Sequence, residues 1–303
     1  MEIKIATRKS PLALYQAEAV KQAIIDKYPD CICELIPLDS EGDKDLRPIH
    51  ELGGKGVFVK RLEEALVMGD ADIAVHSLKD VPADLNNEFQ IVATLERANP
   101  SDSIIFKEPI TLDQLEDKSI IATSSPRRAA QVKLLNPSLE VRPVRGNIHT
   151  RIKKLKDNQF DALVIATAAL DRLQLNLENV EKIDSSIMLP AATQAIIGIE
   201  VGRDINPQKL EIIKSINHNE TYFIASVERK IIKYLEGDCN SAIALICKKV
   251  KESTFEMNLR AFDHKSLKVE KIDMSFIEAE LDQFYLELFN KIEDLKIKEL
   301  ISN

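Results

Sequence analysis

Strand-like and helix-like segments alternate along the first two thirds of the chain, and this alternation limits the folds open to it. In the first third, EIKIAT, CICELIPL and ADIAVHS have strand patterns, and helical patterns cover residues 11–27 and GVFVKRLEEALVMG. In the middle third, KSIIAT, LEVRPV and DALVIAT have strand patterns, with helices from Pro126 and over about residues 148–158. Strands that alternate with helices favour parallel sheets covered by helices on both faces. The sequence therefore predicts an α/β fold.

The order of elements changes near His218. A helical segment, ETYFIASVERKIIKYLEG, is followed by DCNSAIALICKKV, EMNLRAF and KVEKIDMS, which have strand patterns, and a long amphipathic helix ends the chain. Consecutive strands flanked by helices are typical of a small α+β domain. Cys239 lies in the turn after the first of these helices, just beyond Gly237, a residue type that commonly caps helix C-termini. We expect that turn to leave Cys239 accessible.

The composition narrows the class of function. The chain has 303 residues, of which 45% are hydrophobic and 30% charged, enough for two or three domains with cores of their own. Its net charge of −8 argues against broad binding of nucleic acid or of an anionic membrane, so an anion site would be a local cluster. The start lacks a signal-peptide core, and no apolar run has the length of a membrane span. These features predict a soluble cytoplasmic protein.

The four cysteines do not predict a metal site. Cys31, Cys33, Cys239 and Cys247 show neither CxxC pairs nor the His/Cys spacing of metal ligands, and disulfides would be unusual in the cytosol. Cys31 and Cys33 alternate with Ile32 in a strand pattern. We therefore expect both to be small buried hydrophobic residues.

Cations stand at helix starts, where the helix dipole disfavours them. In IIATSSPRRAAQ, Ser125 is a candidate cap and Pro126 takes the first helical position, which places Arg127 and Arg128 in the first turn. The dipole costs each cation about 0.3–1 kcal/mol there. Together with the hydroxyls of Ser124 and Ser125 and the free N–H groups of the turn, the guanidinium groups would bind an anion. The alternative is an Arg pair that is simply solvated.

The same placement of cations recurs at two other helix starts. KIATRKSPLAL places Arg8 before the candidate cap Ser10, and Arg145 and Arg151 flank the candidate cap Asn147. A single arginine at a helix start would not indicate an anion site. Three starts in a chain of net negative charge favour a pocket for a ligand with several carboxylates or phosphates, because such a ligand needs many charge-assisted hydrogen bonds to offset its desolvation.

Two of these joints also echo each other. KIATRKSP and IIATSSPRR both run from a strand through Thr and polar residues to Ser-Pro and a helix. In open α/β sheets, ligands bind beyond the carboxyl ends of strands, so we expect residues 8–10 of one domain to face residues 123–128 of another across a cleft. The alternative is that joints of strand, cap and helix look alike in unrelated proteins.

Two further segments carry groups suited to chemistry. ADIAVHSLKDVPADL is a hydrophobic strand that ends in His76, Lys79 and Asp80 before Pro82. A carboxylate at a strand end in a cationic site would stabilise a cation developing on a substrate, whereas a Lys–Asp surface pair contributes only about 0–1 kcal/mol. The turn GGKG carries Lys55 in a mobile loop or a simple turn, without the spacing of a phosphate-binding loop. We expect His76 to be packed in the strand rather than to bind metal.

Six motifs together resemble a known family. IATRKSPLAL, GGKGVFVKRLE, DIAVHSLKDVP, ATSSPRR, VRGNIHTR and LEGDC stand in the order and near the spacing of the porphobilinogen deaminase (hydroxymethylbilane synthase) family. The resemblance extends over essentially the whole chain, and the ordered set is highly specific. It implies two α/β domains like those of periplasmic binding proteins and a third, small α+β domain. The implied boundaries are residues 1–98 with 196–213, residues 99–195, and residues 218–303.

The resemblance also implies a reaction and a cofactor. A dipyrromethane made from substrate would be joined through a thioether to Cys239. Porphobilinogen would lose ammonia to give an azafulvene, which the terminal pyrrole attacks, until a linear tetrapyrrole is released by hydrolysis. Asp80 matches the catalytic aspartate, which would hydrogen-bond the pyrrole N–H groups and stabilise positive charge. The residues matched to cofactor and substrate binding are Arg8, Ser10, Lys55, Lys79, Thr123, Ser124, Ser125, Arg127, Arg128, Arg145, Arg151 and Arg172. The family resemblance suggests a monomer.

The chain departs from the family pattern near the cysteine and at the domain crossover. Asp238 replaces a usual glycine before Cys239, and Ala242 replaces an expected proline three residues after it. Like-charge repulsion from Asp238 would raise the pKa of the thiol and make cofactor attachment less efficient. Residues 193–196 read TQAI where the family has GQGA, which predicts a stiffer crossover.

The chief alternative to an enzyme is a noncatalytic two-lobed binding protein for a small polycarboxylate. Glu41 and Glu51 stand where many relatives are basic, which would weaken the cationic field of the site. Retention of Asp80 together with Cys239 nevertheless favours the enzyme, because a carboxylate inside an anion site costs binding energy and needs a chemical reason. A structural protein would explain neither group.

Overall fold

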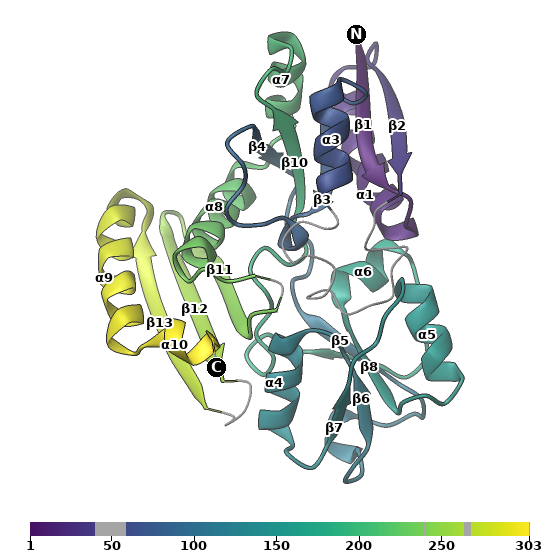
Figure 1. The fold of residues 1–303 in the computed structure, drawn as a ribbon, viewed down its shortest axis with the longest axis vertical. Coiled ribbons are helices and arrows are strands. Elements are labelled where there is room, and N and C mark those ends of the chain that lie inside the picture. The colour runs from purple at the N-terminus through teal and green to yellow at the C-terminus, as the bar shows by residue number, and fades with distance from the viewer. Residues whose placement is uncertain (40–58, 239, 264–267, 303) are drawn as a thin grey trace. The chain divides into compact units, whose positions relative to one another are not determined.

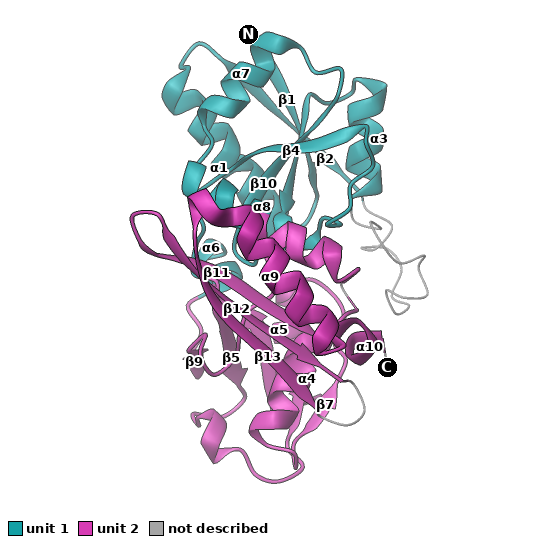
Figure 2. Ribbon diagram, turned by 90° about the vertical axis from the view of Figure 1, so that its left-hand side faces the viewer, with its two compact units in different colours: residues 1–99, 168–175, 194–226 teal, residues 100–167, 176–193, 227–303 magenta. Residues whose placement is uncertain are grey.

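The chain forms two compact units, each with its own core. Figure 1 shows the computed structural model, which describes residues 1–39, 59–238, 240–263 and 268–302. Unit 1 contains residues 1–99, 168–175 and 194–226, and unit 2 contains residues 100–167, 176–193 and 227–303 (Figure 2). Each unit is therefore assembled from segments that are far apart in the sequence.

Unit 1 is built on a five-stranded sheet with the order β2-β1-β3-β10-β4. Its strands are β1 (Glu2–Arg8), β2 (Ile32–Leu38), β3 (Ile73–Ser77), β4 (Phe89–Thr94) and β10 (Ile197–Gly202). β1 pairs with β2 and β3 in parallel, as the alternation predicts, but β10 runs antiparallel to β3 and β4. The prediction of a parallel sheet is wrong here, because β10 returns from a later segment of the chain rather than through a strand–helix–strand crossover.

Helices cover both faces of this sheet. α1 (Pro11–Lys27) begins where the sequence predicts, because Ser10 Oγ accepts the N–H of Ala13 and Pro11 fits the first turn. α1 and α7 (Pro207–Ser215) share the larger core cluster, which contains Ile3, Ile5, Ala17, Val20, Ile24, Ile73, Ile199 and Ile213. α3 (Lys60–Met68) packs Leu62 and Ala65 with Ala6 and Ala74, which alternate along their strands with the residues of that core and so lie on the other face.

Cys31 and Cys33 are buried in the unit 1 core, as predicted. Burial, with an added effect of Cys31, raises the pKa of the Cys33 thiol to about 12. Cys33 therefore stays protonated at neutral pH, which makes it a packing residue and not a reactive thiol.

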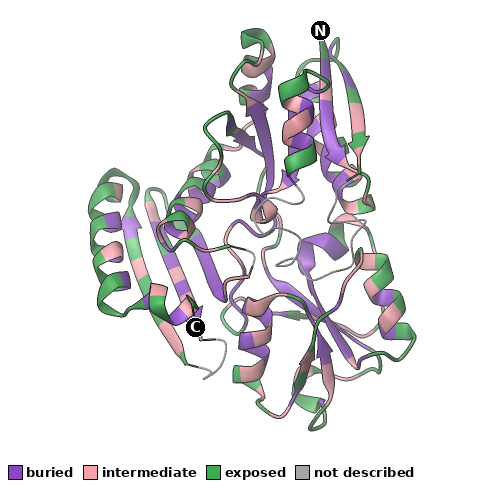
Figure 3. Ribbon diagram, in the orientation of Figure 1, coloured by how far each residue is buried: buried purple, intermediate pink, exposed green. Residues whose placement is uncertain are grey.

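The first part of unit 2 also contains a five-stranded mixed sheet, in the order β7-β6-β8-β5-β9. Its strands are β5 (Asp102–Phe106), β6 (Ile120–Ala122), β7 (Glu140–Arg142), β8 (Ala162–Ala166) and β9 (Val180–Ile183). β6 is parallel to β7 and β8, whereas β5 is antiparallel to β8 and β9. The prediction of a parallel sheet is therefore also wrong for the two pairings that β5 makes. α4 (Pro126–Leu135) and α5 (Ile148–Lys156) follow β6 and β7. The residues of β5 and β8 are all buried (Figure 3).

A separate antiparallel sheet completes unit 2. It contains β11 (Ile243–Lys251), β12 (Thr254–Phe262) and β13 (Val269–Ile277) in that order. α8 (Asn219–Tyr234) precedes it, and α9 (Leu281–Asp294) and α10 (Ile297–Ser302) follow it. The single closing helix of the prediction is broken at Lys296, which has a φ of 51°. The prediction of an α/β chain with a small separate α+β part is confirmed.

The remaining helices are short. α6 (Thr167–Arg172) leads from unit 2 into unit 1, and the 3-10 turns are η2 (Leu78–Asp80), η3 (Leu112–Gln114) and η4 (Glu278–Glu280). Within the described ranges, we find no helix that is both long and apolar enough to cross a membrane.

The crossover segment 193–196 has an unusual backbone. Thr193 has a φ of 55° and Ala195 a φ of 71°, at the two positions where the family pattern has glycine. A residue other than glycine costs about 1–2 kcal/mol in this left-handed conformation. Thr193 and Ala195 are both buried, so contacts around them must offset that cost. Threonine and alanine have a narrower range of allowed φ values than glycine, which supports the prediction of a stiffer crossover. That stiffness stays a prediction.

Candidate active site

The joint between β6 and α4 has the local structure that its sequence predicts. Ser125 is the N-cap of α4 and its Oγ accepts the N–H of Arg128 at 3.5 Å, with Pro126 in the first turn. Ser124 Oγ donates to the carbonyl of Val144 at 2.7 Å and accepts the Val144 N–H at 2.9 Å. Thr123 Oγ1 accepts the Ser125 N–H at 3.2 Å. These hydroxyl groups therefore hold the strand-to-helix loop and its neighbour after β7 in place.

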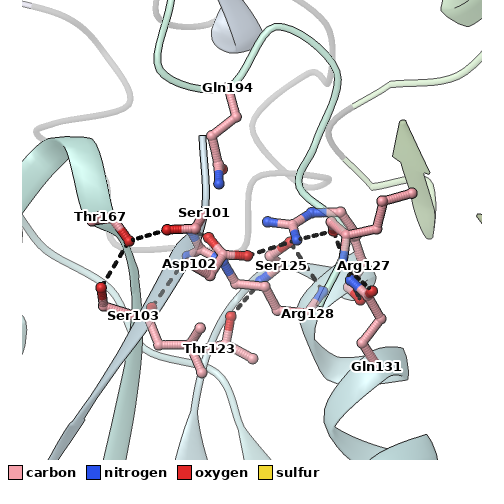
Figure 4. A network of polar contacts seen from close by, with 12 residues as sticks. Ser101, Asp102, Ser103, Thr123, Ser125, Arg127, Arg128, Gln131, Thr167 and Gln194 are labelled. Carbon is pink, nitrogen blue, oxygen red and sulfur yellow. Dashed lines mark hydrogen bonds and ion pairs between the residues drawn. The ribbon is translucent and has the colours of Figure 1, made fainter. Parts of the chain in front are cut away.

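Arg127 and Arg128 point into unit 2 and share one buried carboxylate. Figure 4 shows Asp102, at the start of β5, between the two guanidinium groups. Arg127 Nη1 donates to Asp102 Oδ2 at 2.7 Å, and Arg128 Nε and Nη2 donate to Asp102 Oδ1 at 3.1 and 2.7 Å. The carbonyls of Leu189 and Val164 accept further hydrogen bonds from Arg127 and Arg128. This cluster of Asp102, Arg127 and Arg128 is called the Asp–Arg cluster below.

The charged groups of the Asp–Arg cluster strongly affect one another's pKa. Burial alone would raise the pKa of Asp102, but the charges of Arg127 and Arg128 and their hydrogen bonds outweigh it and hold that pKa well below its usual range. Burial and Arg128 lower the pKa of Arg127, and the charge of Asp102 counteracts this. Two guanidinium groups on one carboxylate leave an excess of one positive charge. Arg127 Nε is buried and has no hydrogen-bond partner among the described residues.

This geometry changes the interpretation of the arginine pair. Arg127 is 3% exposed and Arg128 7%, so the alternative of a solvated pair is wrong. The pair is also committed to a carboxylate that sequence reasoning missed, 25 residues before Arg127. A signal was present in SDSIIF, because an aspartate at the head of a buried strand needs a cationic partner. The excess positive charge still suits an anionic ligand.

Arg145 and Arg151 are more accessible than Arg127 and Arg128. The side chain of Asn147 caps α5 by accepting the Thr150 N–H at 2.9 Å, as predicted. Arg151 Nε donates to the carbonyl of Gly146 at 2.7 Å. Gly146 has a φ of 108°, and a Cβ there would lie 2.7 Å from Thr150 Cγ2, so this turn requires glycine. Arg145 and Arg151 are both half-buried, with part of each side chain open to solvent.

In unit 1, the corresponding joint lies between β1 and α1. Arg8 ends β1 and is half-buried, and Ser10 caps α1. Thr7 Oγ1 donates to the carbonyl of Ala13 at 3.1 Å, and Lys9 pairs with Asp39 at 3.1 Å on the surface. Both joints that echo each other in sequence are thus capped by the serine that precedes proline.

Asp80 and Lys79 lie in η2, which follows β3 in the same unit. Lys79 Nζ donates to Gln194 Oε1 at 3.1 Å. Asp80 is half-buried, and in the described part of the chain no hydrogen bond or ion pair to its carboxylate is found. A half-buried carboxylate at a strand end that the described residues leave unpaired is available to a ligand.

Among the residues that the structure describes, no side-chain carboxylate pairs with Arg172. Arg172 ends α6, and its Nη2 donates to the carbonyl of Ala195 at 2.7 Å. Burial lowers the pKa of Arg172, although Tyr15 counteracts this in part. Arg97 Nε donates to the neighbouring carbonyl of Gln194 at 2.9 Å. Both arginines thus hold the left-handed crossover segment on the unit 1 side.

The predicted cofactor cysteine, Cys239, and the predicted loop lysine, Lys55, lie outside the described residues, as do Glu41 and Glu51. Before the cysteine, the exposed Asp238 accepts hydrogen bonds at Oδ1 from the Asn240 N–H at 2.8 Å and from Ser241 Oγ at 3.0 Å.

The helix before this turn ends differently from the prediction. The left-handed residue is Glu236, with a φ of 55°, and not Gly237. Gly237 is closely packed instead, since a Cβ there would lie 2.8 Å from Ile243 Cδ1 and would displace that side chain. The expected helix cap is therefore wrong by one position, since the helix ends earlier than its apolar pattern suggests.

Residues 3–209 match the family model described as porphobilinogen deaminase, dipyrromethane cofactor binding domain. The chain belongs to the porphobilinogen deaminase family. Porphobilinogen deaminase of Ruthia magnifica is 35% identical over 99% of both chains. That of Lawsonia intracellularis is 41% identical over 82% of this chain and 81% of its own. The recognition made from the ordered motifs is thereby confirmed.

Among solved structures, the periplasmic VFT2 domain of Bordetella pertussis BvgS aligns with 76% of this chain and 91% of its own, at 17% identity and a TM-score of 0.43.

Porphobilinogen deaminases are transferases that form hydroxymethylbilane, and the matched part of this chain is their cofactor-binding domain.

The residues present fit a dipyrromethane. Such a group is a polycarboxylate, and the structure offers guanidinium groups at two helix starts of unit 2. The Asp–Arg cluster carries excess positive charge and a buried Arg127 Nε without a partner among the described residues. Unsatisfied donors of this kind favour an anionic ligand.

Proposed function

We propose that this chain is a porphobilinogen deaminase that joins four porphobilinogen molecules stepwise, with loss of ammonia, and releases linear hydroxymethylbilane by hydrolysis. The observation that carries the proposal is family membership combined with Asp80, a carboxylate left unpaired by the described residues at the end of β3. A noncatalytic polycarboxylate-binding protein would have no use for that carboxylate, because it repels the ligand.

Asp80 is proposed as the catalytic residue. Its carboxylate accepts hydrogen bonds from pyrrole N–H groups and stabilises the positive charge that develops as ammonia leaves. The effect is strongest on the transition state, where the charge is largest. Lys79, next to it, is held by Gln194 and is proposed to bind a substrate carboxylate.

Cationic residues, together with the hydroxyl residues at the helix starts, are proposed to hold the carboxylates of the growing product. When bound, dipyrromethane supplies the nucleophilic pyrrole carbon at which the product grows. Each added pyrrole brings more carboxylates, so several guanidinium groups must be available in turn. The residues proposed for this role are Arg8, Ser10, Lys55, Thr123, Ser124, Ser125, Arg127, Arg128, Arg145, Arg151 and Arg172. The partial exposure of Arg145 and Arg151 supports direct contact with the carboxylates of the product, whereas the buried Asp–Arg cluster contributes its excess positive charge from inside the protein.

Attachment of the cofactor by a thioether to Cys239, a cytoplasmic location and a monomeric state complete the proposal. Asp238 would slow that attachment by like-charge repulsion of the thiolate.

The intact mass of the purified chain tests the proposal. We expect an excess that corresponds to two linked pyrrole units, because a loaded primer is required before any turnover. Cys239→Ala should lose the excess, whereas the matched control Cys31→Ala, which alters a buried thiol of unit 1, should retain it. Incubation with porphobilinogen should then release hydroxymethylbilane and ammonia from the loaded chain alone.

A native chain that carries no added mass, even after incubation with porphobilinogen, would contradict the enzyme and favour the binding protein. A mass excess that persists in Cys239→Ala would instead contradict the attachment site. Size-exclusion chromatography with light scattering tests the monomer, and fractionation of cells tests the location.

A further inference from the structure

A histidine and a glutamate form a buried pair in the unit 1 sheet, just before the turn that carries Asp80. His76 lies on β3 and Glu200 on β10, and these strands are antiparallel neighbours in which Gly198 stands opposite His76. His76 Nε2 lies 2.8 Å from Glu200 Oε2. The side chains are 5% and 0% exposed. The prediction that His76 is packed in the strand is therefore correct, but it is packed against a carboxylate.

The pair lies on the face of the sheet that α3 covers. Ala74 stands opposite Glu200 in the strand register, and it packs with Leu62 and Ala65 of α3. The same helix brings a second carboxylate, because burial and the charge of Glu200 raise the pKa of Glu63, while His76 lowers it. This site thus combines two carboxylates and one imidazole on the face of the sheet that α3 covers.

A buried carboxylate of this kind needs a hydrogen-bond donor. A buried carboxylate without a cationic or protonated partner costs several kcal/mol, and Glu200 Oε1 already has no hydrogen-bond partner among the described residues. The hydrogen bond between His76 Nε2 and Glu200 Oε2 satisfies one polar atom of each residue. Loss of either partner would remove the side-chain bond between β3 and β10 at this position.

The pair lies close to η2, the turn that carries Asp80, because His76 stands two residues before Leu78. The N–H of Leu78, the first residue of η2, donates to the carbonyl of Ile196 at 3.0 Å, which continues the pairing of β3 with β10 toward Asp80. Gly198 packs beneath Leu78, since a Cβ on Gly198 would lie 2.8 Å from Leu78 Cδ1. The position of η2 thus depends on how β10 lies against β3.

We propose that the His76–Glu200 hydrogen bond positions Asp80 by fixing β10 against β3 at the base of the η2 turn. His76 and Glu200 are positioning residues and do not contact substrate. Their relevance to turnover rests on the proposed function, whereas their effect on the turn is a property of unit 1 itself. The pair is 124 residues apart in sequence, so it joins two segments that no local interaction holds together.

The test compares Glu200→Leu with Glu200→Gln in the full chain. Glutamine keeps the size and one hydrogen bond to His76, whereas leucine keeps the size alone. The first readout is hydrogen exchange of peptides that contain the Leu78 amide. We expect Glu200→Leu to exchange at least about tenfold faster there, and Glu200→Gln to remain within about threefold of the native chain.

Asp72→Asn is the matched control. Asp72 pairs with Lys209 at 2.7 Å beside the opposite end of β3, so its loss removes a cross-element ion pair without touching η2. The Leu78 amide should stay protected in that variant. The second readout is turnover, in which Glu200→Leu should lower kcat at least about tenfold, with a smaller change in KM and with the cofactor mass retained.

The outcomes test the positioning role of the His76–Glu200 pair separately from the proposed function. Native-like exchange at Leu78 in Glu200→Leu, or equally fast exchange in Asp72→Asn, would overturn the positioning role whether or not the chain is an enzyme. Faster exchange with unchanged kcat would overturn it as well. Should Glu200→Leu fail to fold, His76→Leu removes the same hydrogen bond from the other partner, and His76→Gln, which can still donate to Glu200, is its conservative counterpart. A native chain without turnover or added mass would defeat the proposed function, while the exchange result would still decide whether the pair fixes the turn.

Discussion

Replacing Asp80 with alanine should lower kcat for porphobilinogen by roughly 10²–10³-fold, the effect of removing one group aimed at a developing charge. The residue ends η2 and is half-buried, and its carboxylate is not used by the described residues, so its removal breaks no internal contact that we observe there. Stability and the covalent cofactor mass should therefore stay near native values. Steady-state kinetics and the intact mass of the same preparation measure both.

Two further variants sharpen this result. Asp80→Asn keeps the shape and one acceptor but removes the charge, so it should retain more activity than alanine if hydrogen bonding contributes alongside charge. Asp84→Asn alters an exposed carboxylate in the same loop and should remain within about twofold of native turnover. Near-native turnover in Asp80→Ala would refute the assignment of Asp80 as the catalytic residue.

Replacing Asp102 with asparagine should destabilise the chain by about 3–5 kcal/mol, because it leaves two buried guanidinium groups without their counter-charge. The substitution conserves volume, so no cavity contributes to the loss. Arg127 and Arg128 donate three hydrogen bonds to this carboxylate, at 2.7, 3.1 and 2.7 Å. Urea denaturation followed by circular dichroism measures the free energy of unfolding.

An exposed ion pair provides the control for Asp102. Glu140 and Arg142 pair at 2.8 Å on the surface of the same unit, and Glu140→Ala should cost no more than about 1 kcal/mol. Equal losses for Asp102→Asn and Glu140→Ala would mean that the Asp–Arg cluster contributes no more than a surface pair. Replacing both arginines with leucine is a poorer test of ligand binding, because it strands the Asp102 carboxylate and destabilises unit 2 at the same time.

Asp102 should also make stability depend on acid. Because the arginines hold the pKa of Asp102 well below its usual range, its stabilisation is complete above the unfolded value of about 4 and is lost as the pH falls from there toward the folded-state pKa. The native chain should lose stability below about pH 4 more steeply than Asp102→Asn. Parallel slopes in the two chains would contradict this contribution.

Local sequence predicted most elements because their signals act within a few residues. Ser10 and Ser125 cap the helices that follow them, and Pro11 and Pro126 fit the first turns. Alternating apolar residues predicted the buried strands β1, β3, β6 and β8. The alternation did not predict β4, β5, β9 and β10, because β10 and β5 enter their sheets antiparallel and from distant segments, outside the strand–helix–strand pattern.

The candidate site was predictable in its residue types but not in their partners. The ordered motifs identified the family, and the strand end at Lys79 and Asp80 lies where the sequence placed it. The sequence did not reveal that Arg127 and Arg128 are buried against Asp102, or that His76 is paired with Glu200. Each of these pairings joins residues on different strands and helices.

By itself, the sequence determined the helix starts, many of the buried strands and the family, and it predicts the residues that carry the chemistry. Only the tertiary structure decided which charges are neutralised inside the protein and which remain for a ligand. The physical reason is range: caps and apolar periodicity depend on neighbours three or four residues away, whereas the energy of a buried charge depends on whichever distant residue folds beside it.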